Sequence, residues 1–387
     1  MPSTHRGGTL RLDEDVTELC TEIFADLPRS DQRRRGREYV RGLLGTRGRK
    51  SIRNIAGISE DPAAEQALHH FVSDSTWDWM PVRRALTRRV TRSAGVRAWV
   101  LHPTLIPKAG THSVGVGRKF SAGLRHSLNA QRAVSLWTAT PDFVTPVNWR
   151  LHLNEDWLTD DKRRRRAAIP DEVVPQSLGA CAVDTYLELD GTPGGLVLVD
   201  AREMDAETVV RRLRASGAAV LARVPAGLGL IAADGVTPGG STGGGLPGGP
   251  EVQPAGELAA AARRSRRPVF APGARRPVLA GTAGVRLPST RTRDPLTLIE
   301  LTPHGGTGPS RLWLTSCDNL GLASLVRLTS LVARVGHELE TTGDRVGLRD
   351  FTGRSYAGWH RHATLASAAH TVLATHGSAT PAPGRTA

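Results

Sequence analysis

Lysine is the scarcest charged residue in this chain of 387 residues. The 51 basic residues include only four lysines, so arginine supplies the other 47 positive side chains. Cysteine is scarce as well, because Cys20, Cys181 and Cys317 lie far apart and form no CxxC pair. This spacing excludes a disulfide framework and a cysteine-ligated zinc site.

Long apolar runs are also missing. The stretches 195–199 and 218–221 are followed within two residues by Asp200 and Arg223, far short of the roughly 20 residues that a membrane-spanning helix needs. The N-terminus lacks the apolar core of a signal peptide. The sequence therefore predicts a protein without a membrane span, and we expect it in the cytoplasm.

Several enzyme motifs are absent too. No HExxH pair occurs. The GxSxG and GxGxxG spacings occur only inside the glycine-rich run at 239–248, which does not sit between a strand and a helix and lacks the Lys-Ser/Thr end of a P-loop. These absences argue against hydrolase, metalloprotease and dehydrogenase chemistry. We expect no small-molecule substrate.

What the chain has instead is positive charge. With 51 basic and 37 acidic residues, its formal net charge is +14. Arginine, alanine, glycine and proline are enriched together, which GC-rich coding also produces, so codon bias is an alternative source of part of this charge. A surplus of this size favours phosphate-rich partners through counterion release, and we expect double-stranded DNA.

Periodicity and composition divide the chain into five segments. Residues 1–95 have the pattern of a basic helical, DNA-binding region, and 96–224 alternate strands with helices, which predicts a mixed α/β sheet. Residues 225–312 are rich in Gly, Pro and Arg and are expected to form an irregular insertion. Residues 313–376 continue the core with C-terminal helices, and 377–387 form a disordered tail.

Individual elements follow from the spacing of apolar residues and from turn residues between them. Strands are expected at 96–101, 112–118, 130–138, 147–153, 195–200 and 218–224, and helices at 171–189, 205–216, 322–339 and 356–375. Trp77 and Trp79 are expected to be core or interface anchors instead of platforms for bases.

Motifs spread along the chain carry a family resemblance. They read Arg29-Ser30-Asp31-Gln32-Arg33-Arg34, Arg49-Lys50-Ser51-Ile52, Pro107-Lys108-Ala109-Gly110-Thr111-His112, Pro146-Val147-Asn148-Trp149-Arg150, Gly347-Leu348, Gly353-Arg354-Ser355 and Trp359-His360-Arg361-His362. In these motifs the chain resembles the insertion-sequence transposases of the DDE superfamily, most closely the insertion sequence 701 type. The likeness covers most of the chain outside 225–312 and the tail.

The resemblance implies an α/β fold with a ribonuclease-H-like catalytic core, an N-terminal helical region and an irregular insertion. It also implies DNA transposition, a form of DNA recombination. Two aspartates and a glutamate would hold a pair of Mg²⁺ or Mn²⁺ ions, which activate the attacking oxygen and stabilise the leaving one. Carboxylate oxygens are the ligands that such hard ions prefer.

The triad positions implied by the resemblance are altered in this chain. The first aspartate falls where His102 and Pro103 stand, and neither is a good Mg²⁺ ligand. The second matches Asp200, whose alternative role is to cap the following turn. The glutamate falls on Gly336, and Glu340 lies about 6 Å further along the helix axis, too far to replace it. We therefore predict a degenerate catalytic site in which Asp200 alone survives, as a weak metal ligand.

Basic residues on the N-terminal helices and on the matching motifs are the expected DNA contacts, with ordinary solvated helix faces as the alternative. They are Arg33, Arg34, Arg35, Arg37, Lys50, Arg83, Arg84, Lys108, Arg118, Lys119 and Arg354. The sequence thus favours a transposase-like DNA-binding protein with impaired cleavage. Two alternatives stay open: an active metal-dependent transposase with a displaced ligand set, and a non-functional remnant. A homodimer is also compatible with the sequence.

Overall fold

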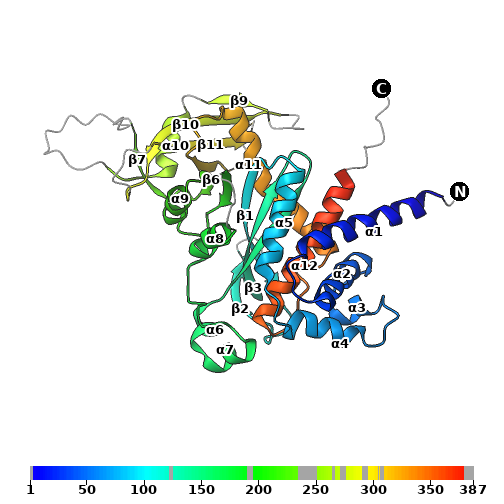
Figure 1. Ribbon diagram of the computed structural model, residues 1–387. Coiled ribbons are helices and arrows are strands. Elements are labelled where there is room, and N and C mark those ends of the chain that lie inside the picture. Colours follow the sequence, from blue (N-terminus) through cyan, green and yellow to red (C-terminus); the bar gives the residue numbers. More distant parts are fainter. Residues whose placement is uncertain are drawn as a thin grey trace, which may run out of the picture. The chain divides into compact units, whose positions relative to one another are not determined.

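The computed structural model describes residues 3–121, 125–189, 195–233, 251–263, 266–270, 276–289, 295–303, 305 and 309–378. The chain forms two compact units (Figure 1). The first comprises Met1–Arg97, His102–Gly191 and Arg334–Ala387, and the second comprises Ala98–Leu101 and Thr192–Ala333. Two elements, β1 (Ala98–Pro107) and α11 (Leu322–Glu338), contribute residues to both units.

Helices open the first unit. They are α1 (Ser3–Ile23), α2 (Ser30–Gly45), α3 (Ile52–Ala56), α4 (Ala64–His69), the π-helix η1 (His70–Asp74) and α5 (Trp79–Ser93). Residues 1–95 are therefore largely helical, as the sequence predicts. They are not separate from the rest of the unit, because the C-terminal helix α12 (Tyr356–Ser378) packs against α1, α2 and α5.

The sheet of the first unit is antiparallel. Strand β3 (His126–Ala139) pairs with β2 (Gly117–Ser121) and with β4 (Val144–His152). The residues that flank β1 also pair antiparallel with β3, because Arg97 N donates to Ala139 O at 2.8 Å and Lys108 N donates to Asn129 O at 2.9 Å. Helices α5 and α12 cover β4.

Two predicted elements of this unit begin later than expected. Residues 112–116 form turns, with Gly115 at a φ of +76°, so the strand predicted from 112 begins only at Gly117. The helix predicted from 171 begins at Leu178, where the Ser177 side chain accepts a hydrogen bond from Ala180 N. Pro175 disfavours the helical conformation of the residue before it, which accounts for the late start.

Three short helices follow β4: α6 (Glu155–Thr159), α7 (Asp161–Ala167) and α8 (Leu178–Leu187).

In the second unit, the first residues of β1 pair in parallel with β5 (Leu196–Asp200), and β5 pairs in parallel with β6 (Ala219–Val224). Helix α9 (Ala206–Ala215) connects β5 to β6. Parallel and antiparallel pairs occur together within the second unit, and helices accompany the strands of both units, so the predicted α/β class is confirmed.

The second unit continues with antiparallel strands: β12 (Arg311–Thr315), β11 (Leu296–Pro303), β10 (Val278–Arg286) and the shorter β7 (Gly229–Ala232), β8 (Gln253–Pro254) and β9 (Arg267–Val269), with helix α10 (Ala255–Ala262). Most of these lie in the predicted irregular insertion, 225–312. Its described parts are more regular than its composition predicts, because Leu298, Ile299 and Leu301 are buried in β11, where the buried Glu300 between them is paired with Arg266.

The described helices include none that is long and apolar enough to cross a membrane. Cys20, Cys181 and Cys317 are buried free thiols, in agreement with the absence of a disulfide framework in the sequence. The predicted tail, 377–387, lies outside the described residues except for its first two positions.

Candidate nucleic-acid cleft and altered metal positions

Motifs that are far apart in the sequence meet in the first unit. The backbone nitrogen of Lys50 donates to Asp350 Oδ2 at 2.8 Å, across 300 positions of sequence. Lys108 Nζ donates to the carbonyl oxygens of Arg349 at 2.9 Å and Phe351 at 2.6 Å. The motif around Lys50, the motif that begins at Pro107 and the residues after Gly347 therefore form one structural feature.

Gly347 makes this meeting possible. Its φ is +74°, and a Cβ at this position would lie 2.3 Å from Lys50 Cγ, so the chain can pass only with glycine here.

His362 on α12 holds the Gly347 carbonyl. Burial lowers the pKa of His362 to about 4, which leaves its ring neutral at pH 7. The Nε2 hydrogen donates to Gly347 O at 2.8 Å, so Nδ1 accepts from the Tyr39 hydroxyl at 2.9 Å.

A cleft of about 790 Å³ opens beside these contacts, entirely within the first unit. Its lining carries five cationic and two anionic side chains, a surplus of three positive charges. The lining residues are Leu44, Gly45, Thr46, Arg47, Gly48, Arg49, Lys50, Ile106, Pro107, Asp344, Arg345, Arg349 and Asp350. We call this feature the basic cleft.

Three arginines of the basic cleft are available to a ligand. Arg47, Arg49 and Arg345 are exposed, and within the described part of the chain their guanidinium groups form no hydrogen bond or ion pair. Arg349, in contrast, is paired with Asp344, with Nε 2.7 Å from Asp344 Oδ1. Exposed guanidinium groups around a concave surface are suited to phosphate oxygens, which they bind in a bidentate way.

Sequence reasoning missed these three arginines. The local run Gly45-Thr46-Arg47-Gly48-Arg49 was a usable signal, because glycines beside arginines mark an exposed turn that can follow a phosphate backbone. Arg345 offers no such signal. It reaches the cleft only through the folding of a segment almost 300 positions away.

Two of the three lysines predicted to contact DNA, Lys50 and Lys108, have another role. Lys50 is only 4% exposed, and its ammonium group donates to Thr46 O. Burial lowers the pKa of Lys108 to about 8, with a smaller opposing effect of Asp350. Because both ammonium groups are turned to backbone carbonyls, these lysines hold the wall of the cleft in place instead of presenting charge to a ligand.

Arg83 is a clear correction to the predicted DNA contacts. Its side chain is 1% exposed, on the face of α5 that packs in the interior. It donates to Thr364 Oγ1 at 2.7 Å, Asn148 Oδ1 at 2.9 Å, Trp149 O at 2.6 Å and His360 O at 2.9 Å. These partners satisfy a guanidinium group that has no access to a phosphate.

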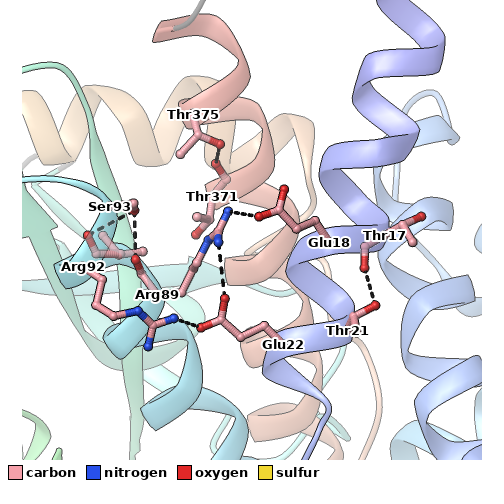
Figure 2. A network of polar contacts seen from close by, with 10 residues as sticks. Thr17, Glu18, Thr21, Glu22, Arg89, Arg92, Ser93, Thr371 and Thr375 are labelled. Carbon is pink, nitrogen blue, oxygen red and sulfur yellow. Dashed lines mark hydrogen bonds and ion pairs between the residues drawn. The ribbon is translucent and has the colours of Figure 1, made fainter.

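Other arginines of α5 are paired with acids of α1 (Figure 2). Arg89 lies 2.8 Å from Glu18 and 3.4 Å from Glu22, and Arg92 donates to Glu22 as well. The sequence pattern favours this helix as a basic DNA-binding face. In the structure two of its five arginines, Arg89 and Arg92, are paired with Glu18 and Glu22, which lie one turn apart on α1.

The remaining predicted contacts divide by exposure. Arg33, Arg35 and Arg37 are half-buried and hydrogen bonded to Leu27 O, Glu38 and Thr21, and Arg84 and Lys119 are half-buried. The exposed ones are Arg34, Arg118 and Arg354. Trp77 is 2% exposed and donates to Phe71 O at 2.8 Å, as expected of a core anchor.

Two of the altered triad positions face each other in the first unit. His102 lies on β1 and Gly336 on α11, and a Cβ added to Gly336 would be 3.7 Å from His102 Cε1, an ordinary contact distance. Pro103 follows His102 on the strand, so its side chain points to the opposite face. Position 102, and not 103, therefore faces Gly336. Neither His102 nor Gly336 carries a carboxylate.

Asp200 belongs to the second unit and is held by two arginines. Arg202 donates to it from Nε at 2.9 Å and Nη2 at 2.8 Å, and Arg223 Nη1 is 3.4 Å from Oδ2. The side-chain hydrogen bond to Asp200 raises the pKa of Arg202. Both carboxylate oxygens thus have cationic partners already.

The side chains at positions 102, 336 and 200 do not fit a pair of divalent metal ions. Mg²⁺ and Mn²⁺ need several free oxygen ligands, whereas a histidine and a glycine occupy two of the three positions and guanidinium groups occupy the oxygens of the third. Across the ranges that the structure describes, no group of three or more His, Cys, Asp or Glu side chains is placed to hold a metal ion.

Comparison with known proteins gives one family match. The profile of the DDE superfamily endonuclease family matches residues 22–272, which include His102, Asp200 and part of the cleft wall. No curated protein matches the chain. Among solved structures, the chain is similar to the piggyBac transposase in a synaptic complex with hairpin DNA, with 12% identity, a TM-score of 0.44, and coverage of 95% of this chain and 72% of that chain.

Proposed function

From the premise that the chain belongs to the DDE superfamily endonucleases, we propose that it is a transposase-like DNA-binding protein with impaired strand cleavage. The observation that carries the proposal is the pair of facing positions His102 and Gly336, which offers no carboxylate to a metal ion. Enzymes of this family generally use divalent metal ions, such as Mg²⁺ or Mn²⁺. The motifs of the chain support the insertion sequence 701 type, and we expect it to act in the cytoplasm.

DNA binding is supported by the basic cleft. Arg47, Arg49 and Arg345 offer three guanidinium groups that nothing in the described part of the protein neutralises. A duplex that contacts them would release about 0.9 counterions per phosphate neutralised, so its affinity should fall as salt increases. The cleft lies in the same unit as His102 and Gly336, the positions where the family resemblance expects two of the metal ligands.

The first test is a titration of labelled duplex DNA at several salt concentrations, repeated with Mg²⁺ or Mn²⁺ while strand nicks are followed. We expect salt-sensitive binding without nicking. Metal-dependent nicking by the unchanged protein would overturn the impairment and favour a displaced ligand set. Absence of binding at low salt would overturn the DNA-binding role and favour a remnant.

A second arm tests the altered positions directly. The double variant His102→Asp with Gly336→Glu places two carboxylates on the facing positions, and we expect it to bind Mn²⁺ more tightly than the unchanged protein, measured by calorimetry. The matched control is Gly95→Glu with Gly321→Glu, which adds the same charge at positions where an added Cβ meets nothing within 4 Å. Equal Mn²⁺ affinity of both double variants would contradict the assignment of positions 102 and 336.

A further inference from the structure

An exposed aromatic ring stands on the edge strand β2. Phe120 is 59% exposed, and few large apolar side chains of the described residues are exposed at all. Its cross-strand partner on β3 is Ser127, whose side chain is too small to cover the ring. Among the described strands, β2 pairs with β3 alone, so none of them adds to this edge. The ring is therefore open to a partner.

The surroundings of Phe120 are cationic. Arg118 is exposed and lies two residues before Phe120, so both side chains point to the same face of the strand. Lys119 lies between them and points to the opposite face of the strand, where burial together with nearby Arg132 lowers its pKa. No carboxylate occurs in the sequence between Asp78 and Asp142. Asp156 is the one acid that acts on Lys119, and it does so from outside the hairpin.

A single exposed apolar residue is ordinary on a protein surface. The combination here is more specific, because an aromatic ring beside an arginine on one strand face can stack on a base while the guanidinium group binds the adjoining phosphate. An apolar protein partner would need a wider apolar patch. The flanking residues on this face are Arg118, Ser127 and Asn129, all of them polar.

We propose that the β2–β3 hairpin is a stacking site for unpaired bases of DNA, with Phe120 against the base and Arg118 on the neighbouring phosphate. Bases inside a duplex are already stacked on both faces, so the ring can reach only a base at a frayed end or in an unpaired segment. This site rests on the proposed DNA-binding function and deepens it, because it names the form of DNA that the protein prefers.

The test compares two labelled DNAs of equal length, a blunt duplex and a duplex with unpaired thymines at one end. The unchanged protein should bind the forked DNA about 5- to 20-fold more tightly, the low end of what one base–aromatic stack provides. Phe120→Ala should remove that preference while blunt-duplex affinity stays the same. Phe120→Trp, which can still stack, should keep it.

Val174→Ala is the matched control, because Val174 is 62% exposed in the same unit but lies outside the hairpin. It should leave the preference unchanged. An equal preference in Phe120→Ala would overturn the stacking site and leave the proposed function standing, whereas absence of any DNA binding by the unchanged protein would overturn both. A change of oligomeric state in Phe120→Ala, measured by sedimentation with no change in preference, would assign the ring to a contact between copies instead.

Discussion

Arginines in two regions of the first unit have opposite roles. In the interior, Arg83 and Arg361 are 1% and 5% exposed and direct their donors to buried acceptors. In the basic cleft, Arg47 and Arg345 are exposed, and no described residue pairs with them. The residue type is the same and the surroundings differ, so the net charge of +14 measures neither stability nor DNA binding by itself.

The difference has an energetic cause. A buried guanidinium group loses its hydration, so burial lowers the pKa of Arg83 to about 10, and only a full set of acceptors makes the charge tolerable. Arg361 meets the same need by donating to the carbonyl oxygens of Trp77 at 3.0 Å and Val72 at 3.1 Å. The cleft arginines keep their hydration and are free to exchange it for phosphate.

The largest effect expected from this comparison is on stability. Arg83→Met should lower the free energy of unfolding by about 3–5 kcal/mol, because it leaves several buried acceptors without a donor. Urea denaturation measures this loss. Arg345→Met, a matched change at the cleft, should alter it by less than about 0.5 kcal/mol. Similar losses in both variants would end the distinction between the two regions.

Two buried histidines of α12, His362 and His370, should make the stability of the protein depend on pH. Burial lowers the pKa of His362 to about 4 and of His370 to about 3, from an ordinary value near 6.5. The unfolded chain therefore binds more protons below pH 6.5, and the free energy of unfolding should fall as the pH drops from 6.5 toward 4, by up to about 1.4 kcal/mol per pH unit for each histidine.

His370→Phe tests this pH dependence. Phenylalanine keeps an aromatic ring against Trp137, whose centroid is 5.2 Å from the His370 ring. The variant should lose less stability than the unchanged protein between pH 6.5 and 5, a difference of up to about 2 kcal/mol. Urea denaturation at pH 7, 6 and 5 gives the comparison. The same pH dependence in both proteins would show that His370 does not resist protonation.

The smallest expected effect is on DNA binding by the cleft. Arg47→Gln and Arg345→Gln should each weaken duplex affinity about two- to fivefold and lower the salt slope by about 0.9, the loss of one phosphate contact. Fluorescence anisotropy at several salt concentrations measures both. Arg88→Gln is the matched control, because Arg88 is exposed on α5 and lies away from the cleft lining. An equal effect of Arg88→Gln would mean that binding follows total charge.

Local patterns predicted much of the fold. Strand β5, helix α9 and strand β6 lie within one or two residues of their predicted bounds, because alternation and helical spacing of apolar residues are properties of neighbouring positions. The insertion was predicted less well, since its average composition hides the buried apolar residues of β11. Arg83 was misassigned for a different reason, because its acceptors are 65 to 281 positions away.

Residue types and near neighbours account for most elements outside 225–312, for the positive charge and for the absence of carboxylates at His102 and Gly336. Packing between distant segments sets which cations can reach a ligand. It buried Arg83 and Lys50, paired Arg89 with α1, and brought Arg345 beside Arg47 to form the cleft. Burial and pairing depend on contacts between distant segments, which local sequence patterns do not encode.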